Sequence, residues 1–246
     1  DARISANMDE RLCSAIENAY YDTKGKPITF EQILDNYRQL IPEGKKDKSD
    51  SVTSILTQLC KVALFEEEDK IDLLKDCYII NLGRCPKDGI YAKAVVYFVI
   101  SKIYDICEQL PPQASNKERY EIRHFTIVDE AHYMLKFDNQ PLQDLIKVGR
   151  SKGMSVILAT QNMSDFKTRK FDFFANVQYP MIMLQQSQND AVLKDLFGVS
   201  GNALQELKNT ISTLQKGEVI IKDTNQDLLG LGCDNNYKKI KVTHLI

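Results

Sequence analysis

The stretch "HFTIVDEAHYM", residues 124–134, joins an apolar run to two adjacent carboxylates. Its β-prone residues, from Phe125 to Asp129, predict a short buried strand. In open α/β sheets ligands bind at the carboxyl ends of the strands, so Asp129 and Glu130 are candidate functional residues. One carboxylate can hold the water shell of Mg²⁺ while its neighbour orients an attacking water, as phosphoryl transfer requires. We assign the first role to Asp129 and the second to Glu130.

A plainer explanation of this acid pair is that it supplies solvated charge near the N-terminus of a following helix. The apolar strand before the pair and the "AH" after it favour the functional interpretation. His132 would then be a partner of the acidic cluster, although a lone histidine is more often structural.

A second apolar run, "MSVILATQN" at 154–162, ends in the polar residues Thr160 and Gln161. If this strand lies beside the first, Gln161 lies beside Glu130 and can hydrogen-bond the γ-phosphate or the attacking water. That is the role of a sensor. A glutamine that only caps a loop is the alternative.

The segment "GRSKG", residues 149–153, has the spacing of the G-x-S-x-G nucleophile elbow. That motif needs a strand before the serine and a helix after it. Here an amphipathic helix precedes the serine and a strand follows it, so Ser151 is not expected to be a nucleophile.

Arg150, at a glycine-flanked helix end, could reach a neighbouring subunit's nucleotide as an arginine finger. An ordinary helix-terminal arginine, favoured by the helix dipole, is the competing account.

The order of the predicted elements indicates an α/β protein. Residues 1–70 carry helical periodicity, including a capping-box pattern at "TFEQ", and predict a helical subdomain or insertion. Residues 71–246 alternate apolar strands with amphipathic helices, the pattern of a mostly parallel sheet covered by helices on both faces. Expected strands include 77–83, 177–185 and two runs near the end of the chain.

Composition fits a folded domain and excludes several classes of protein. The 246 residues carry a net charge of −2, so the chain has no overall positive field that would indicate binding to nucleic acid. Any contact with DNA must therefore be local. The six cysteines contain no C-x-x-C pair and are interpreted as free thiols in a reducing compartment. No apolar stretch approaches the roughly 20 residues that a membrane helix needs. We therefore expect a cytoplasmic protein that makes no membrane contact.

The phosphate-binding half of a nucleotide site is missing from this sequence. A loop of the type G-x-x-x-x-G-K-[ST] needs two glycines five residues apart, and none of the eleven glycines has such a partner. Either the chain never bound ATP, or its first strand and phosphate loop lie upstream of Asp1. We expect the second, a core that lacks its phosphate-loop strand.

The order "FTIVDEAH", "IKVGRSKGMSVILATQN" and "LQKGEVII" resembles the C-terminal part of the ATPase domain in the HerA and FtsK superfamily of DNA-pumping ATPases. The superfamily includes the conjugation and type IV secretion ATPases. The resemblance places the metal and water carboxylates of the Walker B strand at Asp129 and Glu130, the arginine finger at Arg150, and the sensor at Gln161. It covers residues 70–246 well.

The resemblance also carries expectations about the whole protein. It implies a RecA-like core, a hexameric ring of identical subunits, hydrolysis of ATP with Mg²⁺, and movement of double-stranded DNA. The stretch 125–168 further resembles the ATPases of bacterial restriction systems that depend on DNA phosphorothioation, which implies other subunits of a restriction complex as partners. The 246 residues alone are expected to be inactive because the phosphate loop is absent.

Three alternatives stay open. The chain could be a conjugation or type IV secretion ATPase, or a scaffold subunit that has lost its phosphate loop. The retained acids, arginine and glutamine argue against the scaffold. A DEAH-type helicase shares "DEAH", but it needs a second RecA-like domain, and only 85 residues follow Gln161.

Local basic groups are the candidates for contact with DNA. Lys167, Arg169 and Lys170 lie just past the sensor strand, and a second group lies in the basic loop at Lys45, Lys46 and Lys48. Charge runs of this kind are usually solvated faces, which is the alternative for both groups.

Overall fold

The computed structural model describes residues 4–24, 26–45, 49–61, 72–83, 85, 89–113, 121–168, 170–222 and 237–242. The chain forms two compact units, Asp1–Val99 and Ile100–Ile246, and the division falls inside helix α4 (Ile90–Gln109). The predicted boundary at residue 70 lies outside the described residues, so the predicted domain limits stay a prediction.

In the first unit, the described residues before 62 are mainly helical, while residues 72–83 form no helix. Its helices are α1 (Ala6–Asp22), α2 (Phe30–Gln39) and α3 (Ser51–Cys60), with a short 3-10 helix at Glu43–Lys45. The capping box at the start of α2 is present, because Thr29 and Gln32 each bond the other's backbone N–H. Apolar residues from the three helices form one buried core around Ala15, Leu34 and Leu56.

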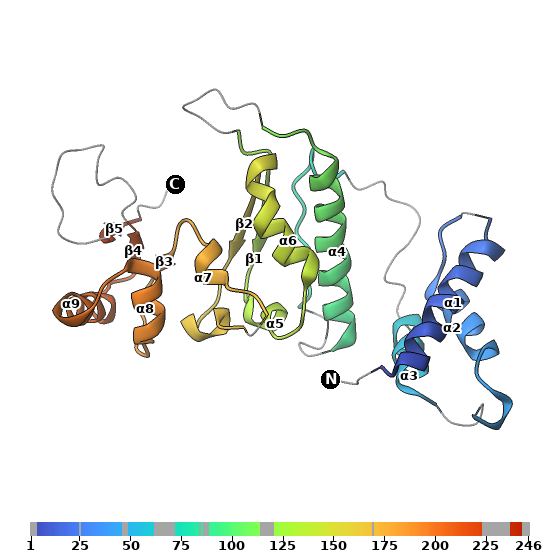
Figure 1. The fold of residues 1–246 in the computed structure, drawn as a ribbon. Coiled ribbons are helices and arrows are strands. Elements are labelled where there is room, and N and C mark those ends of the chain that lie inside the picture. The colour runs from blue at the N-terminus through green and yellow to red at the C-terminus, as the bar shows by residue number, and fades with distance from the viewer. Residues whose placement is uncertain are drawn as a thin grey trace. The chain divides into compact units, whose positions relative to one another are not determined.

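Two neighbouring parallel strands carry the acid pair and the glutamine in the second unit. Strand β1 (His124–Val128) pairs with β2 (Met154–Leu158), and His124 lies opposite Met154 at the start of the register. Between them run α5 (His132–Leu135), α6 (Gln140–Val148) and a 3-10 helix, Gly149–Lys152. Figure 1 shows α6 beside the strand pair. The expectation that the two strands are neighbours is confirmed.

The two faces of this strand pair differ in burial. Thr126 and Met154 point to one face and are buried. On the other face Phe125, Ile127 and Ile157 are 54, 68 and 44% exposed. Helices of the described residues therefore cover one face, where the sequence pattern predicts cover on both.

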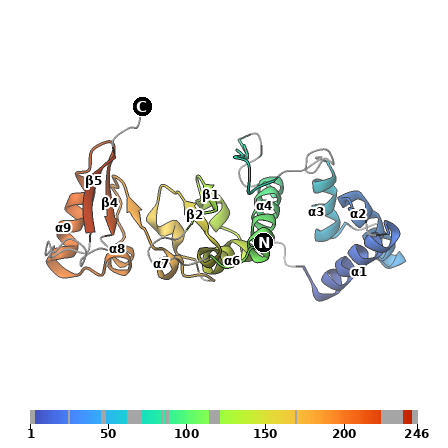
Figure 2. The same cartoon turned by 90° about the horizontal axis from the view of Figure 1, so that it is seen from above.

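The remaining strands form a separate antiparallel sheet in the order β3 (Met181–Ile182), β4 (Glu218–Lys222) and β5 (Tyr237–Lys241). Helices α8 (Asp190–Phe197) and α9 (Gly201–Ser212) pack on it around a buried cluster of aliphatic residues and Phe197. Figure 2 shows both helices beside β4 and β5. A 3-10 helix, Met163–Phe166, and α7 (Phe173–Asn176) connect β2 to this sheet.

The α/β class predicted from the sequence is confirmed, and the strands differ from the prediction in detail. Residues 77–83 do not form a strand, and the run 177–185 is a strand only at Met181–Ile182. The last strands pair antiparallel, where the pattern predicts a mostly parallel sheet. Strand pairing depends on contacts distant in sequence, which local patterns do not specify.

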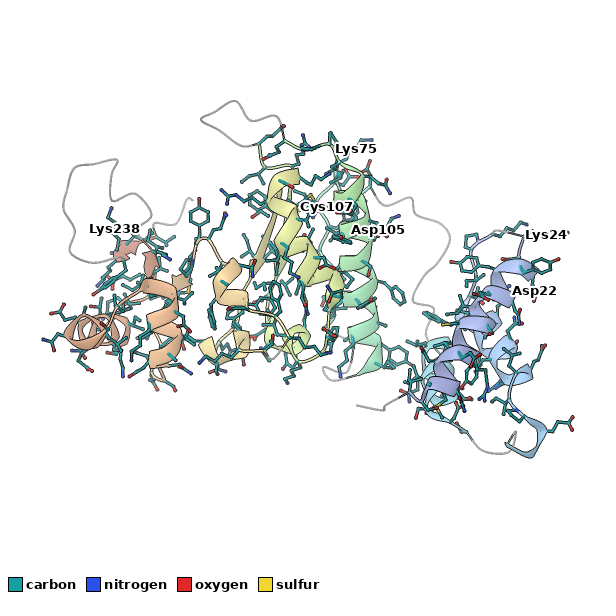
Figure 3. All side chains as sticks on the ribbon, in the orientation of Figure 1. Asp22, Lys24, Lys75, Asp105, Cys107 and Lys238 are labelled. Atoms are coloured by element: carbon teal, nitrogen blue, oxygen red, sulfur yellow. The ribbon has the colours of Figure 1, made fainter. Side chains whose placement is uncertain are left out.

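The five cysteines in the described part of the chain are free thiols. Cys107 on α4, labelled in Figure 3, is fully buried, and this burial raises the pKa of its thiol. Cys233 lies outside the described residues. Within the same part of the chain, none of the helices combines the length and the hydropathy that a membrane crossing requires.

Candidate functional site at the ends of the parallel strands

Backbone hydrogen bonds extend the pairing of β1 and β2 past the last residues of both strands. The Ala159 N–H donates to the Val128 carbonyl (2.9 Å), and the Ala131 N–H donates to the Ala159 carbonyl (2.7 Å). The two strand ends are thus held at one edge. Asp129 and Glu130 follow one strand there, and Gln161 follows the other.

A tight turn at Glu130 ends β1. Glu130 has a φ of 50°, in the left-handed region that side chains with a Cβ rarely occupy. The Oδ1 atom of Asp129 accepts a hydrogen bond from the Glu130 N–H (2.9 Å) and stabilises this turn. The Asp129 side chain thus bonds to the backbone, and Asp129 as a whole is exposed. Strained backbone of this kind clusters at functional sites.

The glutamine from β2 contacts the acid from β1 directly. Gln161 Nε2 donates a hydrogen bond to Glu130 Oε1 across 2.6 Å, and Gln161 itself is exposed. This contact joins residues 31 apart in sequence. The geometry that the sequence predicts for this pair is present, while the sensor role stays a prediction.

His132 approaches the other oxygen of the same carboxylate. Its Nδ1 lies 3.1 Å from Glu130 Oε2, within ion-pair distance, although the two atoms are not aligned as a hydrogen bond. Oε2 is buried and has no hydrogen-bond partner among the described residues. The His132 side chain is 23% exposed and that of Glu130 is 41% exposed. Glu130 therefore lies between a glutamine and a histidine.

Arg150 lies at the opposite edge of the strand pair, before β2 begins. It belongs to the short 3-10 helix Gly149–Lys152 and is exposed. With the side-chain amide of Gln178 turned so that its oxygen faces the arginine, that oxygen accepts from Arg150 Nε (3.2 Å) and Nη1 (2.6 Å). No sequence signal pointed to Gln178. Ser151 donates to the Val148 carbonyl, and the helix-then-strand order around it is confirmed.

The candidate DNA-contact lysines differ in their surroundings. Lys167 is exposed at the end of a 3-10 helix. Lys170 Nζ pairs with Asp138 Oδ2 at 2.5 Å, and this hydrogen bond lowers the pKa of Asp138. Lys167 is thus the freer of the two for a phosphate. Arg169, Lys46 and Lys48, and the side chain of Lys45, lie outside the described residues.

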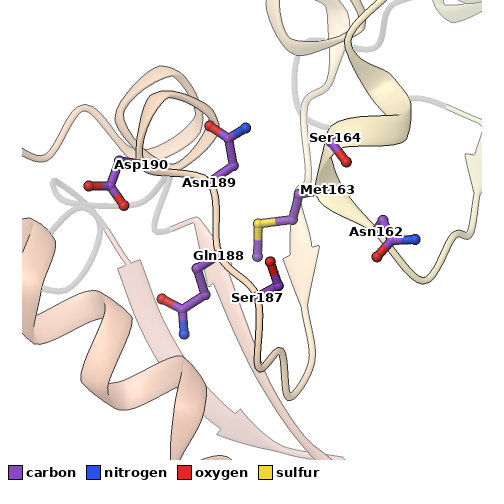
Figure 4. A pocket seen from close by; sticks show the side chains of 7 residues that line it. All are labelled: Asn162, Met163, Ser164, Ser187, Gln188, Asn189 and Asp190. Carbon is purple, nitrogen blue, oxygen red and sulfur yellow. The ribbon is translucent and has the colours of Figure 1, made fainter.

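A polar hollow of about 370 Å³ lies next to the glutamine strand end, as Figure 4 shows. Asn162, Met163 and Ser164 line one side, and residues 187–190 line the other. Glu130 and Gln161 do not line it. Since it also carries no cationic side chain, it lacks the charge that a triphosphate needs.

The donor set at the strand ends fits a magnesium ion shared with phosphates. No cluster of three or more His, Cys, Asp or Glu side chains suited to a metal ion exists in the described ranges. Mg²⁺ in nucleotide sites is usually held by one or two carboxylates, several waters and the phosphates themselves. Asp129 uses Oδ1 for its turn, so Oδ2 can face the water shell of such an ion.

Comparisons with known proteins find one relative by sequence and one similar structure. No protein-family model matches the chain. The DNA import protein CedB of Sulfolobus acidocaldarius is 21% identical over 237 residues, which are 92% of this chain and 36% of CedB. The structure of VirB4 of Thermoanaerobacter pseudethanolicus matches 98% of this chain and 65% of its own, with 17% identity and a TM-score of 0.58. The chain thus has the fold of this VirB4 structure and spans only part of both relatives.

Proposed function

We propose that the chain is part of an ATP-hydrolysing motor of the HerA and FtsK superfamily that moves DNA. It acts as a conjugation-type or DNA-transport ATPase, and the name of one relative, a DNA import protein, supports the transport of DNA. Its contribution to hydrolysis is the acid pair and the glutamine at the ends of β1 and β2. A phosphate loop must be contributed from outside these 246 residues, because none of the eleven glycines has the spacing for one.

The contact between Gln161 and Glu130 is the observation that carries this proposal. Two polar side chains from neighbouring parallel strands meet at 2.6 Å at the edge where α/β sheets bind ligands. Solvated surface charge does not require a glutamine from the next strand or a left-handed backbone at the acid. Both are expected if Glu130 must hold a water for attack on a phosphate.

Each residue has a separate part in the proposed reaction. Asp129 holds the water shell of Mg²⁺, which when bound compensates the charge on the phosphates. Glu130 orients the attacking water and accepts its proton. Gln161 senses the γ-phosphate, and Arg150 acts on the nucleotide of a neighbouring subunit. This last role requires an assembly of identical subunits, for which we propose a hexameric ring.

The DNA substrate is proposed to be double-stranded, with Lys167 as the first candidate contact. Arg169 and Lys170 follow it in sequence and would add to a local basic strip, although Lys170 must leave Asp138 to do so. A phosphate contact by Lys167 predicts that Lys167→Ala weakens DNA binding uniformly across sequences and reduces its salt dependence.

The decisive test is Glu130→Gln in a form of the protein extended to include a phosphate loop. We expect this change to lower kcat about 10²- to 10⁴-fold, because it removes the proton acceptor, while ATP stays bound. Glu206→Gln on α9, at an exposed position, is the control and should leave turnover unchanged. Wild-type turnover by Glu130→Gln would refute the assignment.

A narrower role in restriction is the second candidate. The stretch 125–168 resembles DptH, an ATPase of phosphorothioation-dependent restriction, and this remains a prediction from sequence alone. The names of the two relatives favour transport instead. ATPase stimulation by phosphorothioate-modified duplex, compared with the same unmodified duplex, separates the two functions.

A further inference from the structure

The Glu130 carboxylate has a different neighbour at each of its two oxygens. Gln161 Nε2 donates to Oε1, and His132 Nδ1 lies 3.1 Å from Oε2. Gln161 is exposed at the strand end, while the His132 side chain is 23% exposed and lies at the start of α5. One neighbour is thus accessible to an incoming nucleotide, and the other is largely covered.

The two neighbours also differ in how firmly their positions are fixed. His132 is two residues from Glu130 on the same turn, and its ring contacts that of Tyr133, with centroids 4.0 Å apart and planes tilted by 40°. The carbonyl of Glu130 accepts from the Tyr133 N–H (3.1 Å), which joins the turn to the first residues of α5. Gln161 follows the other strand and lies in a bend outside any helix or strand.

We propose that His132 is a positioning residue that anchors Glu130 through Oε2, while Gln161 holds Oε1 only until nucleotide binds. The inference rests on the proposed function. A γ-phosphate competes for the Gln161 amide, because it carries more negative charge than the Glu130 carboxylate and hydrogen bonds to ionised acceptors are the stronger ones. Oε1 is then free to accept the proton of the attacking water, and His132 keeps the carboxylate in place.

This arrangement couples hydrolysis to nucleotide binding. Without a γ-phosphate, Glu130 Oε1 is occupied and does not activate water. When a γ-phosphate is bound, the Gln161 amide donates to the phosphate instead, and Glu130 Oε1 becomes available to the water in the correct orientation. Loss of His132 would leave Glu130 with one neighbour, and that neighbour departs when the substrate arrives.

The test compares variants of the extended protein by kcat and KM for ATP. We expect His132→Ala to lower kcat about 10- to 100-fold through misplacement of the base, with KM nearly unchanged. His132→Asn, which places an amide nitrogen near the position of Nδ1, should recover most of this loss. In a Glu130→Gln background, His132→Ala should cause no further loss, because the residue acts through Glu130.

Several outcomes would overturn the proposal. They are wild-type kcat in His132→Ala, no recovery in His132→Asn, or an additive loss in the Glu130→Gln background. If His132→Ala does not fold, His132→Gln, which places its amide one bond further out, replaces it and should show the same fall in kcat. A structure with Mg²⁺ and a non-hydrolysable ATP analogue gives an independent readout, in which Gln161 contacts the γ-phosphate and His132 still contacts Oε2.

Failure of the proposed function gives a different result. If wild type and Glu130→Gln hydrolyse ATP equally, the ATPase assignment fails, and the inference about His132 fails with it. If Glu130→Gln is inactive but His132→Ala is as active as wild type, only the inference about His132 fails.

Discussion

Glu130 combines an unfavourable backbone with a well-defined side chain. A left-handed φ costs about 1–2 kcal/mol in a residue with a Cβ, and at Glu130 this φ is 50°. Hydrogen bonds on both sides of the residue, from its own N–H to Asp129 and from the Ala131 N–H to Ala159, offset that cost. The result is that the two acids separate, one contacting backbone and the other contacting Gln161 and His132.

Tyr37 stabilises the helical first unit through a hydrogen bond that can be removed without changing the packing. Its side chain is fully buried, and its hydroxyl donates to Asp50 Oδ2 at 2.7 Å. We predict that Tyr37→Phe lowers the free energy of unfolding by about 1.5–3 kcal/mol, the magnitude of a hydrogen bond to a charged group. Denaturant unfolding followed by circular dichroism measures this change. Tyr21→Phe, at an 86% exposed site, is the control and should have no effect.

Asp50 makes the same unit sensitive to acid. Burial raises the pKa of its carboxyl, but hydrogen bonds from Thr53 and Tyr37 outweigh burial and leave it below the ordinary 3.8. A depressed pKa contributes stability that is present above the unfolded value and is lost as the pH falls through the folded value. We predict that the stability difference between wild type and Asp50→Asn shrinks as the pH falls below 3.8. Thermal unfolding of both proteins across pH tests this, and a constant difference would contradict it.

At the scale of elements, Gly153 forms the left-handed turn that leads into β2. It has a φ of 77°, and a Cβ there would lie 2.7 Å from both Gln113 Nε2 and the Glu121 carbonyl oxygen. We predict that Gly153→Ala destabilises the second unit by more than the about 1–3 kcal/mol of backbone strain alone. Thermal unfolding is the measurement.

Two other glycines serve as controls for Gly153. Gly201 has a φ of 55° and nothing within 4 Å of the point that an added methyl group would occupy. Gly201→Ala should therefore lower the free energy of unfolding by about 1–2 kcal/mol, through backbone strain without crowding. Gly44 has open space around the position of an added Cβ and no positive φ. Gly44→Ala should therefore change the free energy of unfolding by less than about 0.5 kcal/mol. If Gly153→Ala is no worse than Gly201→Ala, the crowding argument is wrong.

The sequence predicts those elements whose signals are local. The acid pair after β1 and the glutamine after β2 follow from apolar runs that end in polar residues, and the capping box of α2 follows from Thr29 and Gln32. The pairing of β3, β4 and β5 is not predictable in this way, because antiparallel register depends on partners distant in the chain. The contact of Gln178 with Arg150 joins a loop to a 3-10 helix distant in the chain and leaves no pattern in the sequence.

At the scale of the whole molecule, the proposed catalytic groups lie at opposite edges of one strand pair. Arg150 precedes β2, whereas Glu130 and Gln161 lie past the ends of β1 and β2. The five residues of β2 span about 16 Å at roughly 3.3 Å each. This is longer than an arginine side chain, so Arg150 cannot serve the acid pair of its own subunit.

An arginine that acts only on a neighbour predicts complementation between two inactive subunits. In the extended protein we expect Arg150→Ala to lower kcat about 10³-fold or more, as loss of an arginine finger does. Mixed with Glu130→Gln subunits, it should regain activity, because roughly a quarter of randomly formed interfaces then combine an intact acid with an intact arginine. Ser151→Ala, the adjacent change, should stay active and also tests whether Ser151 is a nucleophile. Steady-state ATPase assays of each variant and of the one-to-one mixture decide the matter, since an arginine that served its own subunit would give a mixture as inactive as its parts.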